Sequence, residues 1–377
     1  MMKVSPQILK EGDYSIEDIA LLKEKNDIRY INNIYEKQIE EIFEIDNPQL
    51  IGLSEYQNEL QKYKKQTTHS LAGDWIYFPW NGALIHCVCE PNYYRLRTNR
   101  NRDLITTQEQ TKLYNSRILI MGLSVGNSIV TTLAYAGIAR NLILADFDTI
   151  ETANLNRLRA GIHEVGKPKI SLAAEQIYEI NPYAHLELYS DGIKEGDLLA
   201  LSETSKLPDL IFDEIDDFEM KVRLRIFAKV HKKPLVMLTS LGDNVLIDVE
   251  RYDKEPQQRP FQGIVAEEIL DRILTGKVSE KDRIKYAMIL IGQQYIPTRA
   301  LGSLLEIRHS LVGRPQLAST IAIDGGLATI IARMILLNEG IKGGQYYLDS
   351  KKLVNLPSDT GDSEQRTNIV QAINKVI

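Results

Sequence analysis

The sequence has little cysteine and no clear targeting signal. Only two cysteines occur in 377 residues, Cys87 and Cys89, so a framework of several disulfides is excluded, as is a zinc site of four cysteines. We expect both thiols to be reduced and to lie on one strand. No basic stretch precedes an apolar one at the N-terminus, and we expect no apolar run as long as a membrane span. These features favour a cytoplasmic protein.

Basic charge is not in excess either. The 45 lysines and arginines are outnumbered by 51 aspartates and glutamates, which leaves a formal net charge of −6. General nucleic-acid binders usually carry a basic domain. We therefore expect neither nucleic acid nor a membrane as a partner, whereas a local basic pocket for a triphosphate is compatible with this composition.

Residues 1–100 show two successive patterns. Isoleucine and leucine recur at helical spacing between residues 19 and 42, which predicts amphipathic helices. Between residues 74 and 89, β-prone residues flank the pair Asn81-Gly82, which favours a hairpin turn. Because nothing here indicates catalysis, we expect this region to recognise a substrate or partner.

Residues 101–252 alternate between short apolar runs and amphipathic segments. Strands are expected at 117–121, 142–145, 186–188, 210–212, 235–238 and 245–249, and helices at 169–180 and 218–231. This alternation predicts an α/β fold with a doubly wound, mainly parallel, Rossmann-like sheet. From about residue 253 we expect a helical extension of the same domain, 101–377, with a long helix at about 326–337.

A glycine-containing turn between a strand and a helix is the first candidate site. It contains Gly122, Ser124, Val125 and Gly126. Such a turn directs backbone N–H groups and the positive end of a helix dipole towards one place, which suits a phosphate. A dinucleotide fingerprint would require glycine at positions 124 and 127, where the chain has Ser124 and Asn127. The alternative is a tight turn without a ligand.

Two acidic residues, Asp146 and Asp148, follow the next strand. A carboxylate at this strand end can accept hydrogen bonds from both ribose hydroxyls, so the position suits any nucleoside. A solvated strand end with an Asx turn is the alternative.

Three further residues could contact a triphosphate. Asn154 and Arg157 lie where a simple βαβ unit would continue into its crossover helix. The Arg157 guanidinium can pair with two phosphate oxygens at once. Lys169, in the first turn of the helix predicted at 169–180, would place an ammonium near the same site. A solvated surface lysine is the alternative for Lys169.

An acidic cluster follows the fourth strand. It contains four carboxylates within five positions: Asp213, Glu214, Asp216 and Asp217. At the C-terminal edge of a parallel sheet, where ligands bind in open α/β folds, these charges repel and need Mg²⁺ or a Lys/Arg cluster. A helix N-terminus enriched in acids is the alternative.

The order of these motifs resembles the ThiF/MoeB family, in the superfamily of ubiquitin-activating enzymes. The resemblance runs from about residue 97 to 253 and is most specific in 145–157, in 165–169 and in Asn181-Pro182. It implies an adenylyltransferase that uses ATP and Mg²⁺ to activate a carboxylate as an acyl-adenylate. The residues it implies are Asp146 for the ribose, Asn154, Arg157 and Lys169 for the ATP phosphates, and Asp216 for Mg²⁺.

The resemblance also implies partners. Family members act on the C-terminus of a small ubiquitin-like or sulfur-carrier protein, or of a precursor peptide. It further implies a homodimer in which an arginine before the first strand, here Arg100 or Arg102, reaches the ATP site of the partner subunit.

Three departures from the family pattern leave other functions open. Ser124-Val125 replaces the middle glycines of the family's loop, paired Cys-x-x-Cys motifs are missing, and no cysteine follows Cys89 to serve as a thioester site. One alternative is a non-catalytic member that binds a nucleotide or partner, which the altered loop favours. The other is an NAD- or FAD-binding oxidoreductase, which the missing glycines argue against.

Overall fold

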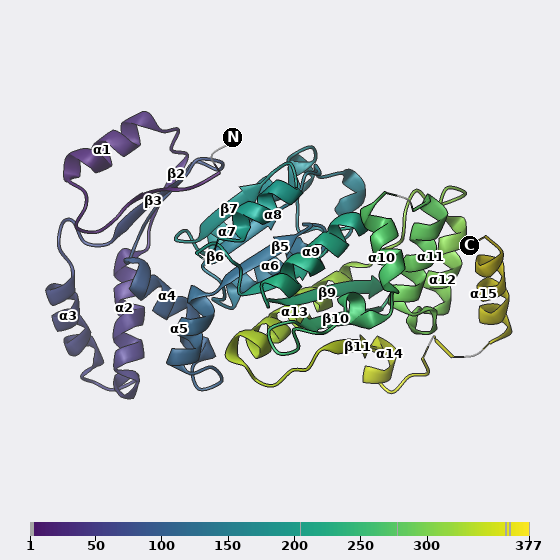
Figure 1. Cartoon of the computed structure of the whole chain (residues 1–377). Coiled ribbons are helices and arrows are strands. Elements are labelled where there is room, and N and C mark those ends of the chain that lie inside the picture. Colours follow the sequence, from purple (N-terminus) through teal and green to yellow (C-terminus); the bar gives the residue numbers. More distant parts are fainter. Residues whose placement is uncertain (1–3, 204, 277, 359, 362, 377) are drawn as a thin grey trace. The chain divides into compact units, whose positions relative to one another are not determined.

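The computed structural model describes residues 4–203, 205–276, 278–358, 360–361 and 363–376 (Figure 1). Its contacts divide the chain into two compact units. The first unit comprises Met1–Tyr114, Ala134–Arg140 and Ala174–His185, and the second comprises Asn115–Leu133, Asn141–Ala173 and Leu186–Ile377.

The first unit contains a four-stranded sheet and several helices. The strands lie in the order β1 (Gln7–Leu9), β3 (Asp74–Phe78), β4 (Ala83–Cys87) and β2 (Tyr30–Asn33). The helices are α1 (Ile16–Lys25), α2 (Tyr35–Asp46), α3 (Tyr56–Thr67), α4 (Glu90–Thr98) and α5 (Thr107–Asn115). The hairpin is confirmed, and Gly82 takes the positive φ of +71° that this turn requires. The predicted helices are found at both ends of the stretch 19–42, but its middle is not helical, because β2 pairs with β4 there.

One expectation about the first unit is wrong. Only Cys87 lies on β4, because the chain leaves the sheet there and Cys89 directly precedes α4. Pro91 in the first turn of that helix favours this early start, since its missing N–H is not needed there. Both cysteines are free thiols, and Cys87 is buried.

The second unit is built on a seven-stranded sheet with the order β11-β10-β9-β8-β5-β6-β7. Strands β9, β8, β5 and β6 are parallel, whereas β10 and β11 are antiparallel to their neighbours. The bounds are β5 (Arg117–Met121), β6 (Asn141–Ala145), β7 (His185–Tyr189), β8 (Leu210–Asp213), β9 (Pro234–Leu241), β10 (Asn244–Arg251) and β11 (Gly344–Leu348). The predicted α/β fold with a mainly parallel sheet is confirmed.

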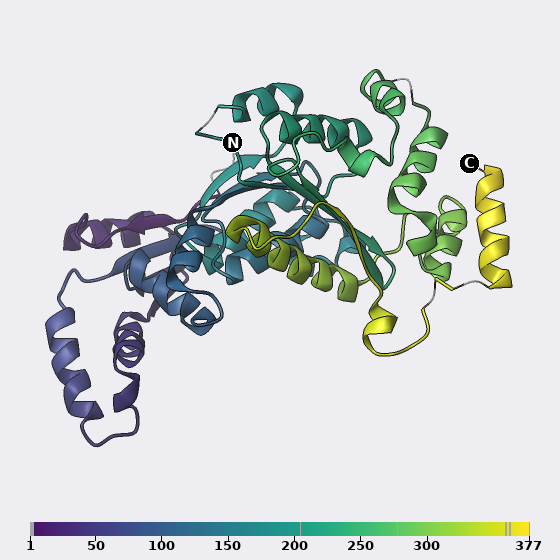
Figure 2. The ribbon, with the colours of Figure 1, turned by 60° about the horizontal axis from the view of Figure 1, so that its bottom comes forward.

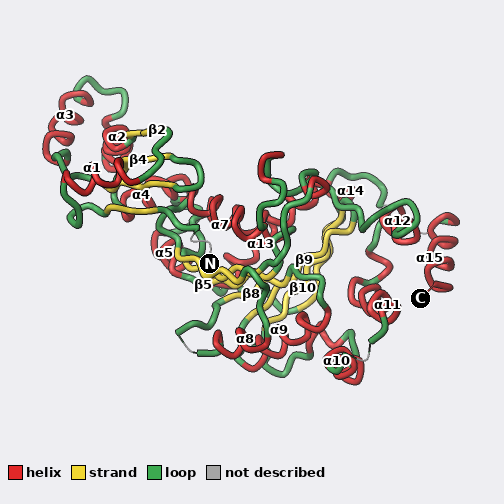
Figure 3. Tube along the Cα trace, turned by 90° about the horizontal axis from the view of Figure 1, so that it is seen from above, coloured by secondary structure: helices red, strands yellow, loops and turns green. Residues whose placement is uncertain are grey.

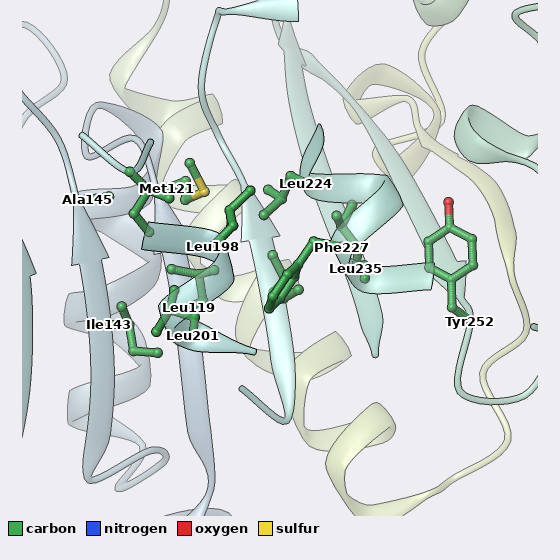
Figure 4. Packing of buried hydrophobic residues seen from close by; sticks show 13 residues of the cluster. Leu119, Met121, Ile143, Ala145, Leu198, Leu201, Leu224, Phe227, Leu235 and Tyr252 are labelled. Carbon is green, nitrogen blue, oxygen red and sulfur yellow. The ribbon is translucent and has the colours of Figure 1, made fainter. Parts of the chain in front are cut away.

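Helices cover both faces of this sheet. Figures 2 and 3 show α8 (Glu195–Leu201) and α9 (Phe218–Val230) on one face and α13 (Ala318–Leu337) on the other. Side chains of α8 and α9, including Leu198 and Phe227, pack on strand residues such as Leu119 and Ile143 in a fully apolar cluster (Figure 4). Burying each such side chain stabilises the fold by about 1.5–3 kcal/mol. The remaining helices are α6 (Val125–Tyr135), α7 (Lys169–Ile180), α10 (Glu267–Leu274), α11 (Glu280–Ile291), α12 (Thr298–Glu306), α14 (Ser350–Leu353) and α15 (Glu364–Val376).

The region after residue 253 is mostly helical, as predicted, and it adds the strand β11 to the edge of the sheet. The predicted long helix is wrong at its start, because α13 begins at Ala318 rather than near 326. Gly325 lies inside it, where a Cβ would lie 2.5 Å from Ser128 Oγ of α6. This glycine therefore permits close packing between two helices.

Helix α13 also corrects the expectation about apolar runs. Its 20 residues are long and apolar enough to cross a membrane by length and composition, and among the described helices it alone meets that test. It packs against β8, β9 and β10 of the second unit, and 44% of its most apolar window is buried. This packing is that of a core helix.

Candidate functional site

The second unit has a topological switch point between β5 and β8. From β5 the chain continues through α6 to β6 on one side, whereas β8 pairs with β5 on the other side. In open α/β sheets, ligands bind at the carboxyl ends of the strands at such a point. The Gly122 turn follows β5 here, and residues 214–217 follow β8.

Gly122 brings these two segments into direct contact. Its φ is +89°, and a Cβ there would lie 2.4 Å from the carbonyl oxygen of Glu214. The Glu214 N–H donates to the carbonyl oxygen of Met121 at 2.8 Å, which continues the β5–β8 pairing. Only glycine tolerates both this conformation and this proximity.

Asp146 holds the glycine turn. Its carboxylate accepts hydrogen bonds from the N–H of Leu123 at 2.6 Å and from the N–H of Asp148 at 2.8 Å. Burial raises the pKa of Asp146, although both hydrogen bonds act in the opposite direction. Each carboxylate oxygen can accept more than one hydrogen bond, so these contacts do not prevent contact with a ribose.

The other members of the turn have different surroundings. Val125 begins α6, whose first turn carries N–H groups without intrahelical acceptors, and Ser124 precedes it half-buried. A Cβ at Gly126 would lie 3.0 Å from Cγ2 of Ile120. Gly126 therefore serves the packing of α6 on β5.

Lys169 and Asp148 form an ion pair near this turn. Lys169 Nζ lies 2.8 Å from Asp148 Oδ2, with side-chain exposures of 9% and 54%. The Lys169 N–H also donates to the carbonyl oxygen of Asp148 at 2.9 Å. Lys169 is thus not a solvated surface lysine. Its ammonium lies beside the exposed carboxylate of Asp148.

Asn154 and Arg157 belong to one short turn. Buried Asn154 accepts a hydrogen bond from the N–H of Glu151 at 3.0 Å through Oδ1, so it stabilises the turn itself. Arg157 Nη1 donates to the carbonyl oxygen of Ala153 at 3.1 Å and to Asn156 Oδ1 at 2.9 Å. Its Nε is buried and has no partner among the described residues.

The charge around Arg157 is unbalanced. Burial lowers the pKa of Arg157, and the nearby Arg314 lowers it further, whereas Glu151 has a smaller opposing effect. Within the described part of the chain, no carboxylate lies within ion-pair distance of Arg157. An anionic ligand would supply the missing counter-charge.

The four carboxylates of the acidic cluster have different environments. Buried Asp213 pairs with Lys221 at 3.0 Å and with Arg225 at 2.6 Å. Burial by itself raises the pKa of Asp213, but these two cations outweigh it and hold the pKa below its usual range. Asp217 caps α9 by accepting from the N–H of Met220 at 2.7 Å. Two possibilities raised for this cluster are therefore found in the structure: a Lys/Arg counter-charge at Asp213 and a helix N-terminus at Asp217.

Glu214 and Asp216 remain at the sheet edge. Glu214 Oε1 accepts from the N–H of Leu238 at 3.0 Å, and burial raises its pKa well above its usual value. Asp216 is exposed and has no hydrogen bond or ion pair among the residues that the structure describes. It is thus the member of the cluster whose carboxylate is available to a ligand.

Asp216 fits a Mg²⁺ ion shared with a nucleotide but not a metal cage. Over the described ranges, no group of three or more His, Cys, Asp or Glu side chains could hold a metal ion. Mg²⁺ at nucleotide sites usually takes only one or two protein carboxylates, and the phosphates and water complete its shell. The arrangement around Asp216 agrees with that pattern.

Arg100 and Arg102 lie in the first unit. Both are exposed, and neither has a hydrogen bond or ion pair with any residue described. The neighbouring Arg97 differs, because its guanidinium donates to the carbonyl oxygens of Ile180 and Ala134 at 2.7 and 2.8 Å. Arg100 and Arg102 are therefore free for an external partner, whereas Arg97 is structural.

Two charged residues near the site did not emerge from the sequence. Asp324 on α13 is fully buried; its Oδ2 accepts from Ser240 Oγ at 2.6 Å, and its Oδ1 has no partner among the described residues. Burial raises the pKa of Asp324 to about 6. The charge of Arg314 lowers the pKa of both Asp324 and Arg157. An aspartate inside a long apolar helix was the available sequence signal.

Comparison with known proteins finds similar sequences and similar solved structures. A Mycobacterium tuberculosis relative, uncharacterized protein MT1398, is 34% identical over 73% of this chain, which spans 38% of that relative. The Escherichia coli molybdopterin-synthase adenylyltransferase is 31% identical over 44% of this chain and 67% of its own length. A solved structure of PaaA covers 71% of this chain and 69% of its own, with 18% identity and a TM-score of 0.47.

The family is identified over most of the chain. The matched region includes both sides of the switch point, from before β5 to the end of α13 except its last three residues. Residues 97–334 match the ThiF family, and the chain belongs to that family.

Proposed function

We propose that this chain is an ATP- and Mg²⁺-dependent adenylyltransferase that converts a carboxylate into an acyl-adenylate. The main support is the meeting, at one switch point, of the Gly122 turn with the segment that carries Asp216. A relative at 31% identity is named an adenylyltransferase, which agrees with this activity.

The proposed reaction requires no covalent bond to the protein. A carboxylate oxygen attacks the α-phosphorus of ATP, the bond to the bridging oxygen breaks, and pyrophosphate leaves with the electron pair. Such a reaction depends on alignment and on neutralising charge. The N–H groups at the start of α6 and the cations Arg157 and Lys169 would provide both.

Each remaining site residue has a proposed task. Asp146, already ordered by two backbone donors, would accept from the ribose hydroxyls. Asn154 would keep the Arg157 turn in shape, and Asp148 would orient Lys169. Mg²⁺ held by Asp216 would reduce the negative charge on the phosphates.

The substrate and final nucleophile follow from what the chain offers. We propose the C-terminus of a small ubiquitin-like carrier or a precursor peptide as the carboxylate, with residues 1–100 contributing to its recognition. No cysteine follows Cys89 in the sequence, so the later part of the chain offers no thioester site. Burial raises the pKa of Cys87 to about 12, which keeps that thiol protonated and disfavours a thioester there as well. The adenylate would therefore pass to an external nucleophile. Two free thiols agree with a cytoplasmic location.

The first experiment is calorimetric titration of the full chain with ATP, with and without Mg²⁺, and with NAD⁺ as the control ligand. We expect MgATP to bind and Arg157→Ala and Asp216→Ala each to abolish or strongly weaken that binding. Tight binding of NAD⁺ without a response to ATP would instead support an oxidoreductase.

A matched variant separates chemistry from helix capping. In a pyrophosphate-exchange assay with an accepted carboxylate, Asp216→Ala should lower the rate by on the order of 10²–10³. Asp217→Ala should retain the rate but lower the free energy of unfolding by about 1 kcal/mol, because it removes the cap of α9. Equal exchange rates for Asp216→Ala and the wild type would contradict the assignment of Asp216.

A further inference from the structure

The segment 307–317, which follows α12, contacts the turn that carries Arg157. Asn156 Nδ2 donates to the carbonyl oxygen of Gln316 at 2.9 Å, and the same side chain accepts from Arg157 Nη1 at 2.9 Å. Asn156 thus links Arg157 to a segment 160 residues further along the chain. Because two residues span at most about 7 Å, Arg314 must lie close to this contact.

Arg314 and Arg157 form an unbalanced pair of cations. Arg157 Nε is buried without a partner, and exposed Arg314 has no hydrogen bond or ion pair within the described part of the chain. Each guanidinium carries a fixed positive charge at neutral pH. Two such groups held near one another destabilise the fold unless an anion lies between them or beside them.

The nearby carboxylates do not remove this imbalance. Asp148 is paired with Lys169, and Asp213 with Lys221 and Arg225. Asp324 is within electrostatic reach of Arg314, yet it makes no ion pair, and its Oδ1 is buried without a partner. Glu151 raises the pKa of Arg157, but burial and Arg314 outweigh it, so the described carboxylates leave the two arginines with an incomplete counter-charge.

We propose that Arg314 and Arg157 together bind the β- and γ-phosphates of the nucleotide, and hence the pyrophosphate leaving group. A triphosphate carries several negative charges and offers paired oxygens that match two guanidinium forks, whereas a substrate carboxylate offers one charge. This inference rests on the proposed adenylation and adds a phosphate-binding residue from the segment between α12 and α13.

The role of Arg314 in the reaction is electrostatic. As the carboxylate oxygen forms its bond to the α-phosphorus, the bond to the bridging oxygen breaks and its electron pair remains on pyrophosphate. A second guanidinium stabilises the charge that accumulates there. Arg314 does not donate or accept a proton in this step.

Three probes test the inference on the full chain: MgATP, inorganic pyrophosphate with Mg²⁺, and AMP. Calorimetry should show that Arg314→Ala weakens the binding of MgATP and of pyrophosphate about 10- to 100-fold. AMP should bind the variant within about twofold of the wild type, because it lacks the phosphates concerned. Arg314→Lys should recover part of the loss, since it restores the charge but not the fork.

Arg259→Ala is the matched control. Arg259 is also an exposed arginine of the second unit, and its ion pair with Glu267 is exposed and 3.7 Å long. The Arg259→Ala substitution removes one positive charge, as Arg314→Ala does, and should leave the affinity for all three probes unchanged.

The outcomes separate this inference from the proposed function. If wild-type protein binds MgATP and Arg157→Ala weakens it, but Arg314→Ala binds all probes normally, the inference is wrong and the adenylation site stands. If Arg314→Ala weakens AMP as much as MgATP, Arg314 acts on the site's shape and the inference is also wrong. If the wild-type protein binds neither MgATP nor pyrophosphate, both proposals fail.

Discussion

Gly122 is the single residue on which the shape of the candidate site depends most directly. It combines a φ of +89° with close proximity to the backbone of Glu214. Asp146, which also holds the turn, acts through two hydrogen bonds that tolerate small movements, whereas a backbone clash does not. A substitution at Gly122 should therefore affect both stability and nucleotide binding.

Gly122→Ala should destabilise the second unit. The positive φ costs an L-residue about 1–2 kcal/mol, and the 2.4 Å approach to the Glu214 carbonyl adds to that cost. Urea unfolding should show the decrease, and MgATP affinity should fall with it. Gly126→Ala is the control, because its Cβ would meet only the side chains of Ile120, at 3.0 Å, and Leu123, at 3.6 Å, and no backbone atom. Equal losses for the two variants would contradict this account.

A second single residue, Asp324, should make the stability of the fold depend on pH. Burial raises its pKa from about 4 to about 6, although Ser240 and Arg314 act against this. Between these values the folded state binds more protons than the unfolded state, so the free energy of unfolding falls as pH rises. The full effect is about 3 kcal/mol at most.

Asp324→Asn provides the measurement. Urea unfolding at pH 4 and pH 7 should show a stability decrease for the wild type that is smaller in the variant, because Asn does not titrate. The Ser240 hydroxyl can still donate to the Asn carbonyl oxygen. Parallel pH profiles for the two proteins would show that Asp324 is not the titrating group.

At the scale of elements, α9 is tied to the sheet through buried Arg225. Its guanidinium lies 2.6 Å from Asp213 of β8 and 2.7 Å from Glu250 of β10, and 3.8 Å from the centre of the Phe261 ring. The network thus connects α9, two strands and the turn Pro260–Gly263. It holds the end of β8, three residues before Asp216.

Arg225→Met should be among the most damaging substitutions in the second unit. It leaves Glu250 buried without a cation and Asp213 with Lys221 alone, and breaking a buried ion pair on one side typically costs about 3–5 kcal/mol. Arg223→Ala on the same helix is the control, because its pairs with Glu195 and Glu219 are partly exposed and contribute about 0–1 kcal/mol. Adding Asp213→Asn and Glu250→Gln to Arg225→Met should restore part of the stability. Urea unfolding of the four proteins checks this order.

At the scale of the whole molecule, the proposed homodimer determines whether Arg100 and Arg102 serve the site. Both side chains are exposed and unpaired among the described residues. If they complete the ATP site of the partner subunit, two inactive variants should complement each other. Closed two-fold symmetry places each subunit's arginines at the other subunit's site.

Subunit mixing tests this arrangement. Asp216→Ala mixed with the double variant Arg100→Ala/Arg102→Ala should recover about a quarter of wild-type activity, since half of the dimers are mixed and each has one intact site. Asp216→Ala mixed with Arg157→Ala should recover none, because both residues serve the same subunit's site. Recovery in neither mixture would contradict the role of the two arginines.

Much of the molecule could be predicted because local patterns are sufficient for it. The runs 118–121 and 210–212 are apolar throughout, as strands covered on both faces require, and β5 and β8 are found there. Helix α7 begins and ends at the predicted residues, since Pro168 precedes its first turn and Asn181-Pro182 ends it. The glycine turn, Asp146 and the acidic cluster were likewise recognisable from their positions after strands.

Contacts between segments that are far apart in the sequence depend on the tertiary structure. The strand β11 pairs with β10 about a hundred residues earlier, and five residues carry too weak a pattern to reveal that pairing. Gly325 packs against α6 from inside α13, and the task of each carboxylate in 213–217 depends on which of them meets Lys221 and Arg225. Arg314 approaches Arg157 only because the chain returns after 160 residues. Local propensity determines elements, whereas long-range packing determines which charges become neighbours.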